Sequence, residues 1–379
     1  MTSERGTQLA IGLLVAVLAA SLLFVARMRH EMRDFEVYWT AGGRAAAAGP
    51  LYRVDDGHYR FKYLPAFAIA VSPLSRLSLP RAKAVWFAVS VASLIGLVWL
   101  SIAAVSDPGM RPAVLAFLTV VAMAKFFAHE LVLGQANLLF GAVCMAGVAA
   151  LLRGRDVRAG LLLGAATLIK PYAIAFVPYL LIVGRPKAAL PATLSVGCVV
   201  LLPLGVYGVG GTASLLAQWW LTASETSAAL LTNADSVSVF AFGAKWLGWG
   251  RGAVVLSALM AAGLCSAFVL VLARRRRVGR PELLEVALLL TYIPLLTPQG
   301  WDYALLLSTP LVALLLARVN TMPAAERALL LSALGIVAFS LYDVLGREVY
   351  GAFMGWSAIT VCYVAIIGVA TRLRVRARA

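Results

Sequence analysis

Long apolar runs separated by short polar segments are the dominant pattern of this sequence. A helix needs about 20 apolar residues to cross a hydrocarbon core of about 30 Å, and most of the runs approach that length. We therefore expect an all-α fold, a polytopic bundle of transmembrane helices that forms a single domain over residues 1–379. The predicted spans are residues 8–26, 83–104, 112–129, 137–152, 188–209, 252–273, 282–297, 303–318, 326–343 and 353–371.

Residues 159–183 allow two interpretations. A single straight helix would place Lys170 near the bilayer centre, which costs about 2.5–3.5 kcal/mol on insertion scales. Pro171 would also remove a helical hydrogen bond there. Two short limbs hinged at Lys170-Pro171 put the lysine at the far interface instead. The hinge predicts twelve spans, and the single helix predicts eleven.

The distribution of basic residues bears on this choice. Cytoplasmic loops of membrane proteins carry an excess of Lys and Arg. Eleven spans with the N-terminus outside would make the strongly basic segment 27–83 cytoplasmic, so charge alone favours that alternative. We nevertheless expect twelve spans with both termini inside. The basic excess outside is then confined to segment 27–83, where basic residues can bind a phosphate instead of setting topology.

The composition agrees with a protein embedded in lipid. Of 379 residues, 62% are hydrophobic and 13% are charged, whereas soluble domains are nearer half apolar and a quarter charged. The net charge of +16 is typical of basic residues that face anionic headgroups and set topology. We expect membrane lipids as partners and no nucleic acid.

Two long polar stretches, residues 27–82 and 210–251, fall on the same extracytoplasmic side of the twelve-span topology. The first carries Asp34 and several other carboxylates just beyond the first span. A carboxylate beside a low-dielectric region can have its proton affinity tuned for general-base work. Arg44 and Lys62 can bind a phosphate. Tyr38 and Tyr63 can either offer aromatic faces to a sugar or anchor the segment at the membrane interface.

Cysteine and histidine usage gives no metal or cofactor signal. All four cysteines lie in apolar runs without CxxC spacing, and they are interpreted as small hydrophobic residues. The three histidines are scattered, so no metal site and no cofactor are expected. The apolar run after Met1 ends in RMRHEMRD, not in a small-residue cleavage site, so we interpret it as an uncleaved first span.

Several short patches follow one another between about residue 34 and residue 310. They are DFEVYWTAGGRAAAAGPLY, FKYLPAFAIAVSPLSRL, GQANLLF at 134–140, AGLLLGAATLIKPY at 159–172, WW at 219–220 and TPQGWDY at 297–303. No patch is specific alone. Together, in this order and spacing, they resemble glycosyltransferase family 87, the polyprenol-phosphate-sugar-dependent mannosyltransferases of the C-type membrane superfamily.

The resemblance implies a fold of about a dozen helices with a long first extracytoplasmic loop that carries the catalytic carboxylate, Asp34 in this chain. By implication, Asp34 deprotonates an acceptor hydroxyl, which attacks the anomeric carbon with inversion while the lipid phosphate leaves. Basic side chains would stabilise the phosphate. The predicted substrate-binding residues are Glu36, Tyr38, Arg44, Lys62, Tyr63, Gln135, Asn137, Lys170, Trp301 and Asp302. For Gln135 and Asn137, hydrogen bonding between helices is an equal alternative.

One position departs from the family pattern. Related sequences often have His near the Trp of the late patch, whereas this chain has Asp302 and Tyr303 after Trp301. An aspartate would repel a donor phosphate. The role of Asp302 is therefore open between an acceptor contact and a metal contact.

The partners that the resemblance implies are a polyprenyl-phosphate sugar donor and a lipid or glycan acceptor, at the extracytoplasmic face of the plasma membrane. Mannose is the family default, and arabinofuranose is an alternative. A transporter or flippase of sugar-lipids is a second class of function, although no repeated halves are visible. A membrane phosphotransferase is a third, although no Asp-rich motif is present. The sequence does not indicate an oligomeric state.

Overall fold

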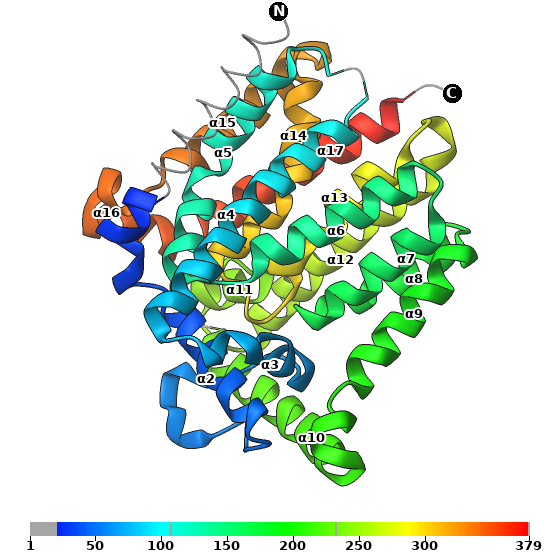
Figure 1. Ribbon diagram of the computed structural model, residues 1–379. Helices are drawn as coiled ribbons and strands as arrows, with labels where there is room; N and C mark the ends of the chain where they lie inside the picture. The colour runs from blue at the N-terminus through cyan, green and yellow to red at the C-terminus, as the bar shows by residue number, and fades with distance from the viewer. Residues whose placement is uncertain (1–20, 107, 232, 378–379) are drawn as a thin grey trace, which may run out of the picture.

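The computed structural model describes residues 21–106, 108–231 and 233–377 (Figure 1). Over these residues the chain is helical, with a single isolated β-bridge between Ser236 and Trp301 and no strand. The prediction of an all-α fold is confirmed. Most of the predicted first span, 8–26, lies outside the described residues; residues 21–26 are described, and they are helical.

The α-helices are α2 (Arg33–Ala46), α3 (Pro65–Val71), α4 (Leu79–Ala104), α5 (Pro112–Leu133), α6 (Asn137–Leu152), α7 (Asp156–Ala165), α8 (Phe176–Ile182), α9 (Pro186–Leu201), α10 (Leu204–Leu230), α11 (Val239–Leu247), α12 (Arg251–Ala273), α13 (Pro281–Leu296), α14 (Thr309–Ala317), α15 (Ala324–Phe339), α16 (Tyr342–Gly355) and α17 (Ala358–Arg376). Short 3₁₀ turns connect several of them.

Among the described residues, α4, α5, α12 and α17 are long and apolar enough to cross a membrane. The number becomes six if the two bent pairs, α9 with α10 and α15 with α16, each count as one span. The segments Asn137–Leu152, Pro171–Ile182 and Asp302–Ala317 are apolar but shorter. A polytopic helical protein is therefore confirmed, while the count of twelve spans, or eleven, stays a prediction.

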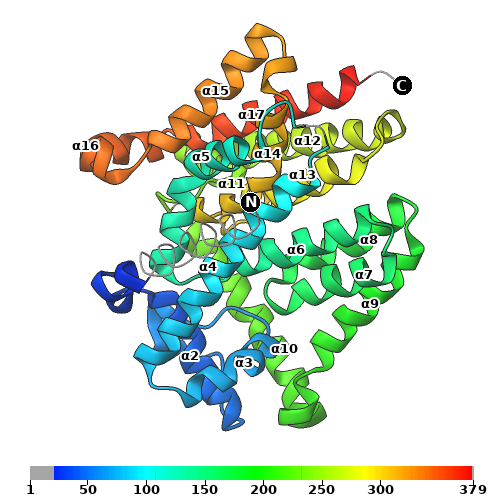
Figure 2. The same cartoon turned by 45° about the horizontal axis from the view of Figure 1, so that its top comes forward.

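The ambiguous stretch 159–183 folds as two limbs. Helix α7 and the turn Ala166–Leu168 form the first, and the turn Pro171–Ala175 and α8 form the second. Lys170 lies between them in extended backbone, with φ −139° and ψ 127°. The limbs lie side by side in both views (Figures 1 and 2). The hinge predicted at Lys170-Pro171 is thus confirmed.

Two glycines let α7 pack closely against α9. A Cβ atom at Gly160 would overlap the carbonyl oxygen of Ala188, and one at Gly164 would overlap that of Ala192. Small residues four positions apart are the usual device for close helix contact in membranes. The contact fixes the hairpin whose tip carries Lys170.

The predicted span 188–209 is wrong in its second half. Helix α9 ends at Leu201, and the chain bends by 84° into α10. Pro203 lies at the bend, and Gly208 adopts φ 66° just beyond it, so both the missing N–H and the left-handed residue interrupt a straight helix. Much of the predicted polar segment 210–251 is consequently helical, in α10 and α11.

A second bend, of 103°, separates α15 from α16 and ends the predicted span 326–343 early. Lys125 in α5 is 5% exposed, and its Nζ donates to the carbonyl oxygen (2.9 Å) and the hydroxyl (3.1 Å) of Ser340. The ammonium therefore satisfies a carbonyl at the end of α15 that has no helical partner.

The two ends of the bundle differ in chemistry. Arg185 lies 3.6 Å from Asp156 and donates to Glu282 (2.9 Å), and Arg275 donates to the carbonyl of Val183 (3.0 Å). These bonds join the loops 153–155, 183–185 and 274–280, which together with residues 372–377 we call the basic end. Helices α2, α3 and α10 gather at the opposite end (Figures 1 and 2), which we call the site end.

The glycine contact predicts a stability effect. Replacing Gly164→Leu forces α7 away from α9 and should cost about 1–3 kcal/mol, the usual range for overpacking. The midpoint of thermal unfolding in detergent should fall. The control is Gly197→Leu in α9, where an added side chain meets no atom within 4 Å. Equal midpoints for the two variants would contradict the close contact.

Candidate functional site

The start of α2 is pinned to the end of α5. The backbone N–H of Met32 donates to the carbonyl of Val132 (2.8 Å). Met32 is 1% exposed and has φ 65°. Asp34 lies in the first turn of α2, immediately after this anchor. Its position is therefore fixed by contacts between the first segment and the core helices.

Gly134 allows α2 to approach the turn between α5 and α6. It ends α5 in the left-handed conformation, with φ 69°, which favours glycine. A Cβ atom at this position would lie 2.9 Å from the Cβ atoms of Met32 and Phe35. Trp86 in α4 donates to the Gly134 carbonyl (2.8 Å). A larger residue would push α2 away from the turn.

Gln135, the next residue, links Asp34 to two tyrosines. Its Nε2 donates to Asp34 Oδ2 (2.6 Å), and its Oε1 accepts from the hydroxyls of Tyr38 (2.9 Å) and Tyr63 (2.8 Å). The hydroxyls of Tyr38 and Tyr63 are 2.5 Å apart. All four residues were predicted for the site, and the structure brings them together.

Lys170 completes this network from the tip of the α7–α8 hairpin. Its Nζ donates to the hydroxyl of Tyr63 (2.7 Å) and lies 4.4 Å from the centre of that ring. Lys62 is adjacent in sequence to Tyr63, and Trp219 of α10 donates to the Lys62 carbonyl (3.1 Å). The charges of Lys170 and Lys62, which come from separate segments, both act on the Asp34 carboxylate.

The environment of Asp34 changes its acidity. Burial raises the pKa of Asp34 above its ordinary value, while the hydrogen bond from Gln135 and the charges of Lys170 and Lys62 lower it in part. Among the described residues, Gln135 is the only side chain that bonds the carboxylate, at Oδ2. Oδ1 is left to accept a proton.

Glu130, near the end of α5, stabilises the turn between α5 and α6. It is fully buried, and it accepts hydrogen bonds from the backbone N–H groups of Asn137 (2.5 Å) and Leu138 (3.1 Å) and from the Asn137 side chain (2.8 Å). The carboxylate satisfies N–H groups at the start of α6 that lack helical partners. The side-chain amide of Asn137 is thereby engaged within the fold.

A second polar cluster surrounds Asp302. This residue is fully buried, with Oδ1 lying 3.1 Å from His129 Nδ1 and Oδ2 lying 3.8 Å from Lys125 Nζ. The ring of Tyr303 is 5.1 Å from that of His129 and stacks on Trp301 at 6.2 Å. Asp302 therefore presents no exposed oxygen to a substrate, whereas His129 is partly exposed.

Glu36 and Arg44 lie on a different face of α2 from Asp34 and Tyr38. Glu36 pairs with Lys83 (2.8 Å), and Arg44 forms two bonds with Asp56 (2.5 and 2.8 Å). Together with neighbouring residues, they line a cavity of about 230 Å³. Their predicted role in substrate binding remains untested, but each charge already has a partner.

Glu130, Lys125 and His129 were absent from the predicted set. All three lie in the apolar helix α5, and an ionisable residue within such a run is itself a signal of a functional or structural polar site. Glu130 precedes the GQAN patch by only a few residues. Its contact with Asn137 could thus have been suspected, whereas the contact between His129 and Asp302 joins distant segments and could not.

The arrangement is suited to proton transfer beside an anionic leaving group. Asp34 supplies a carboxylate with an unbonded oxygen, and Lys170 and Lys62 supply positive charge nearby. Among the described residues, no group of three His, Cys, Asp or Glu side chains is placed to hold a metal ion.

Comparison with known proteins identifies one family. The chain matches the glycosyltransferase family 87 model over residues 61–298, which include Gln135 and Lys170 and begin after Asp34. No curated protein and no solved structure matches it significantly. The matched segment covers more than half of the chain and carries several membrane-capable helices. The chain is therefore a membrane protein that belongs to glycosyltransferase family 87.

Proposed function

We propose that this protein is an inverting transferase that moves a sugar from a polyprenyl-phosphate donor to a lipid or glycan acceptor, with Asp34 as the general base. The single observation that carries the proposal is the network of Asp34, Gln135, Tyr63 and Lys170, in which a carboxylate and an ammonium are held at either end of one hydrogen-bonded chain.

In the proposed step, Oδ1 of Asp34 accepts the proton of the acceptor hydroxyl. The hydroxyl oxygen attacks the anomeric carbon from the side opposite the donor phosphate and forms the new glycosidic bond. The bond between that carbon and the phosphate oxygen breaks, and polyprenyl phosphate leaves with the electron pair. The configuration at the anomeric carbon is inverted, and no covalent intermediate is required.

Lys62 and Lys170 stabilise the phosphate in this scheme. Both are close enough to Asp34 for their charges to lower its pKa. A phosphate oxygen that gains charge as the bond breaks is stabilised by cations already fixed in position, because no reorganisation is needed at that moment. Tyr38 and Tyr63 hold Gln135 in place, so that Gln135 orients Asp34.

Asp302 contributes through His129. A carboxylate at Nδ1 fixes the orientation of the imidazole and leaves Nε2 for another partner. We assign to Nε2 a contact with the donor phosphate. Asp302 itself need not repel that phosphate, because its charge is buried against His129 and Lys125. Trp301 stacks on Tyr303 beside them.

The arginine-rich loops at the basic end support a site on the extracytoplasmic side of the plasma membrane. The basic end carries the arginine-rich loops, and such loops stay in the cytoplasm. Asp34 is at the site end, where α2 and α3 gather (Figure 1). The proposed sugar is mannose, with arabinofuranose as the alternative, and both are tested as donors in the assays below.

The first prediction concerns the base. Asp34→Asn preserves the acceptor for the Gln135 hydrogen bond but removes the base, so transfer should fall by about 10²–10⁴-fold. The assay uses purified protein, radiolabelled polyprenyl-phosphate-mannose or its arabinofuranose counterpart, and a panel of lipid acceptors. Donor binding and the thermal midpoint should be unchanged.

The matched control is Asp55→Asn, in the same segment, where the side chain is 85% exposed. It should transfer at the wild-type rate. If the Asp34 variant were as active as this control, Asp34 would not be the base, even though the family assignment would stand.

A second prediction concerns pH. A base works only in its ionised form, so kcat/KM should fall as the pH decreases through the pKa of Asp34. Burial raises this pKa, so the acidic midpoint should lie above the ordinary aspartate value of about 3.9. Gln135→Leu removes a bond that lowers the pKa, and it should move the midpoint to higher pH. A midpoint that does not move, or moves lower, would contradict this role of Gln135.

The third prediction separates His129 and Asp302 from the base. Asp302→Asn removes the negative charge beside His129 Nδ1, so the imidazole carries less positive charge and its contact with phosphate weakens in both the ground state and the transition state. The KM for the donor should rise about tenfold, the value of one charge-assisted hydrogen bond, with a smaller change in kcat. Asp343→Asn in α16 is the control. A loss confined to kcat would argue against the phosphate contact.

A further inference from the structure

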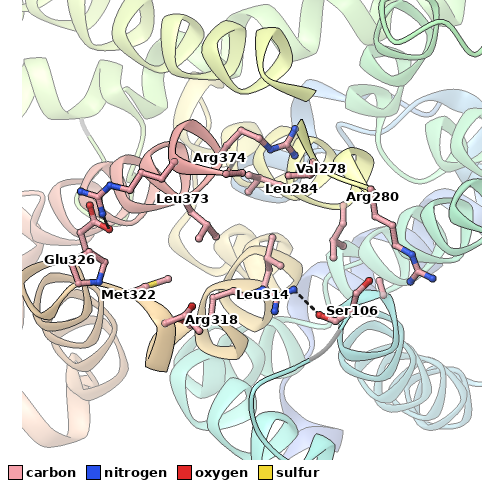
Figure 3. Close-up of a pocket in the computed structure, with 17 residues that line it drawn as sticks. Ser106, Val278, Arg280, Leu284, Leu314, Arg318, Met322, Glu326, Leu373 and Arg374 are labelled. Atoms are coloured by element: carbon pink, nitrogen blue, oxygen red, sulfur yellow. Dashed lines mark hydrogen bonds and ion pairs between the residues drawn. The ribbon is translucent and has the colours of Figure 1, made fainter. Parts of the chain in front are cut away.

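A cavity of about 630 Å³ opens at the basic end (Figure 3). It lies among α13, α14, α15, α17 and the end of α4. Its walls are apolar, formed by Leu283, Leu284, Leu314, Met322 and Leu373. The volume is within the range of about 300–1,000 Å³ that is typical of small-molecule sites.

The polar side chains of this cavity are mostly arginines. Arg280, Arg318, Arg374 and Arg376 line it, against the single carboxylate of Glu326. Arg376 donates to Glu326 (2.8 Å) and Arg374 donates to Glu285 (3.3 Å), so two of these guanidinium groups have a carboxylate partner, and positive charge still exceeds negative charge in the lining. Figure 3 shows the guanidinium groups around the apolar side chains.

Several of these groups are held in place by the fold. Arg374 is 3% exposed and donates to the carbonyl of Pro281 (2.8 Å). Arg318 donates to the carbonyl of Ser106 (2.6 Å). A buried guanidinium fixed in this way loses little side-chain entropy when it binds an anion, because its geometry is already set.

We propose that this arginine pocket, the cavity just described, binds one anionic glycerophospholipid of the membrane. The headgroup phosphate lies against the arginines, and part of an acyl chain lies along the leucines. Basic pockets between membrane helices at the cytoplasmic side are known to hold anionic headgroups. The apolar walls distinguish this ligand from a free anion, which would leave them in contact with water.

The bound lipid fills the space between α13, α15 and α17, whose ends meet at the basic end. It is therefore a structural ligand, separate from the donor, and the inference does not depend on the proposed reaction. If the wild-type protein transfers sugar but forms no adduct with phosphatidylglycerol, the pocket proposal alone is wrong. If it forms the adduct but transfers no sugar, the proposed reaction alone is wrong.

The test is a native mass spectrometry titration of the purified full chain in detergent. The probes are phosphatidylglycerol and phosphatidylcholine with identical acyl chains, so that the two differ in net headgroup charge. We expect a one-to-one adduct with phosphatidylglycerol that forms at least tenfold more tightly. Equal affinity for the two lipids would overturn the proposal, since the arginines would then have no role.

Two variants test the location. Gly279 lines the cavity, and an added side chain there meets no atom within 4 Å. Gly279→Trp should therefore fill the pocket without disturbing the fold and remove the adduct. The control is Gly263→Trp in α12, where an added side chain likewise meets nothing within 4 Å. An unchanged adduct in the Gly279 variant would place the lipid elsewhere.

Charge is tested separately, which keeps the experiment decisive if the tryptophan variant fails to fold. Arg280→Gln and Arg376→Gln should each weaken phosphatidylglycerol binding about fivefold, corresponding to about 1 kcal/mol per basic residue, and leave phosphatidylcholine binding unchanged. Millimolar glycerol 3-phosphate, a headgroup without chains, should not displace the lipid. Displacement by it would show that the pocket takes a free phosphate and would overturn the lipid proposal.

Discussion

The hydrogen bond from Gln135 to Asp34 is the contact on which the site depends, because it joins the first polar segment to the core of the bundle. Its formation requires Gly134, whose lack of a side chain allows α2 to approach. It also requires Glu130, which holds the start of α6. A carboxylate positioned by three separate helices loses little freedom on binding a substrate, and such preorganisation is what catalysis by fixed charges needs.

The distribution of charge over the molecule has two separate causes. At the site end, several cations have a local partner: Lys83 pairs with Glu36, Arg44 pairs with Asp56, and Lys170 donates to Tyr63. At the basic end, arginines exceed carboxylates and join successive loops, as Arg185 and Arg275 do. An excess of arginine at one end of a helical bundle is typical of membrane proteins, in which basic residues set topology and face anionic headgroups.

Much of the fold and part of the site could be predicted from the sequence. Apolar runs located α4, α5, α6, α12 and α13 closely, and Lys170-Pro171 predicted its hinge, because these features are local. The order of the sequence patches, which resembles that of glycosyltransferase family 87, led to the prediction that Asp34, Gln135 and Lys170 belong to one site. Helical periodicity would have separated Glu36 and Arg44 from Asp34, since they lie on another face of α2.

Long-range contacts could not be predicted in this way. The bend at Ser340 depends on Lys125, and the burial of Asp302 depends on His129; in each case the partners are far apart in the sequence. Proline marks the bend at Pro203, but nothing in its neighbourhood indicates that α10 continues as a long helix. Only the packed structure supplies these pairs.

The most direct test of the account is a cryo-electron microscopy structure of the Asp34→Asn variant with an intact polyprenyl-phosphate sugar bound. The account predicts the anomeric carbon facing position 34, with the donor phosphate about 3 Å from the ammonium of Lys62 or Lys170. A donor phosphate bound on the Arg44 face of α2, or a sugar donor bound at the basic end, would contradict it.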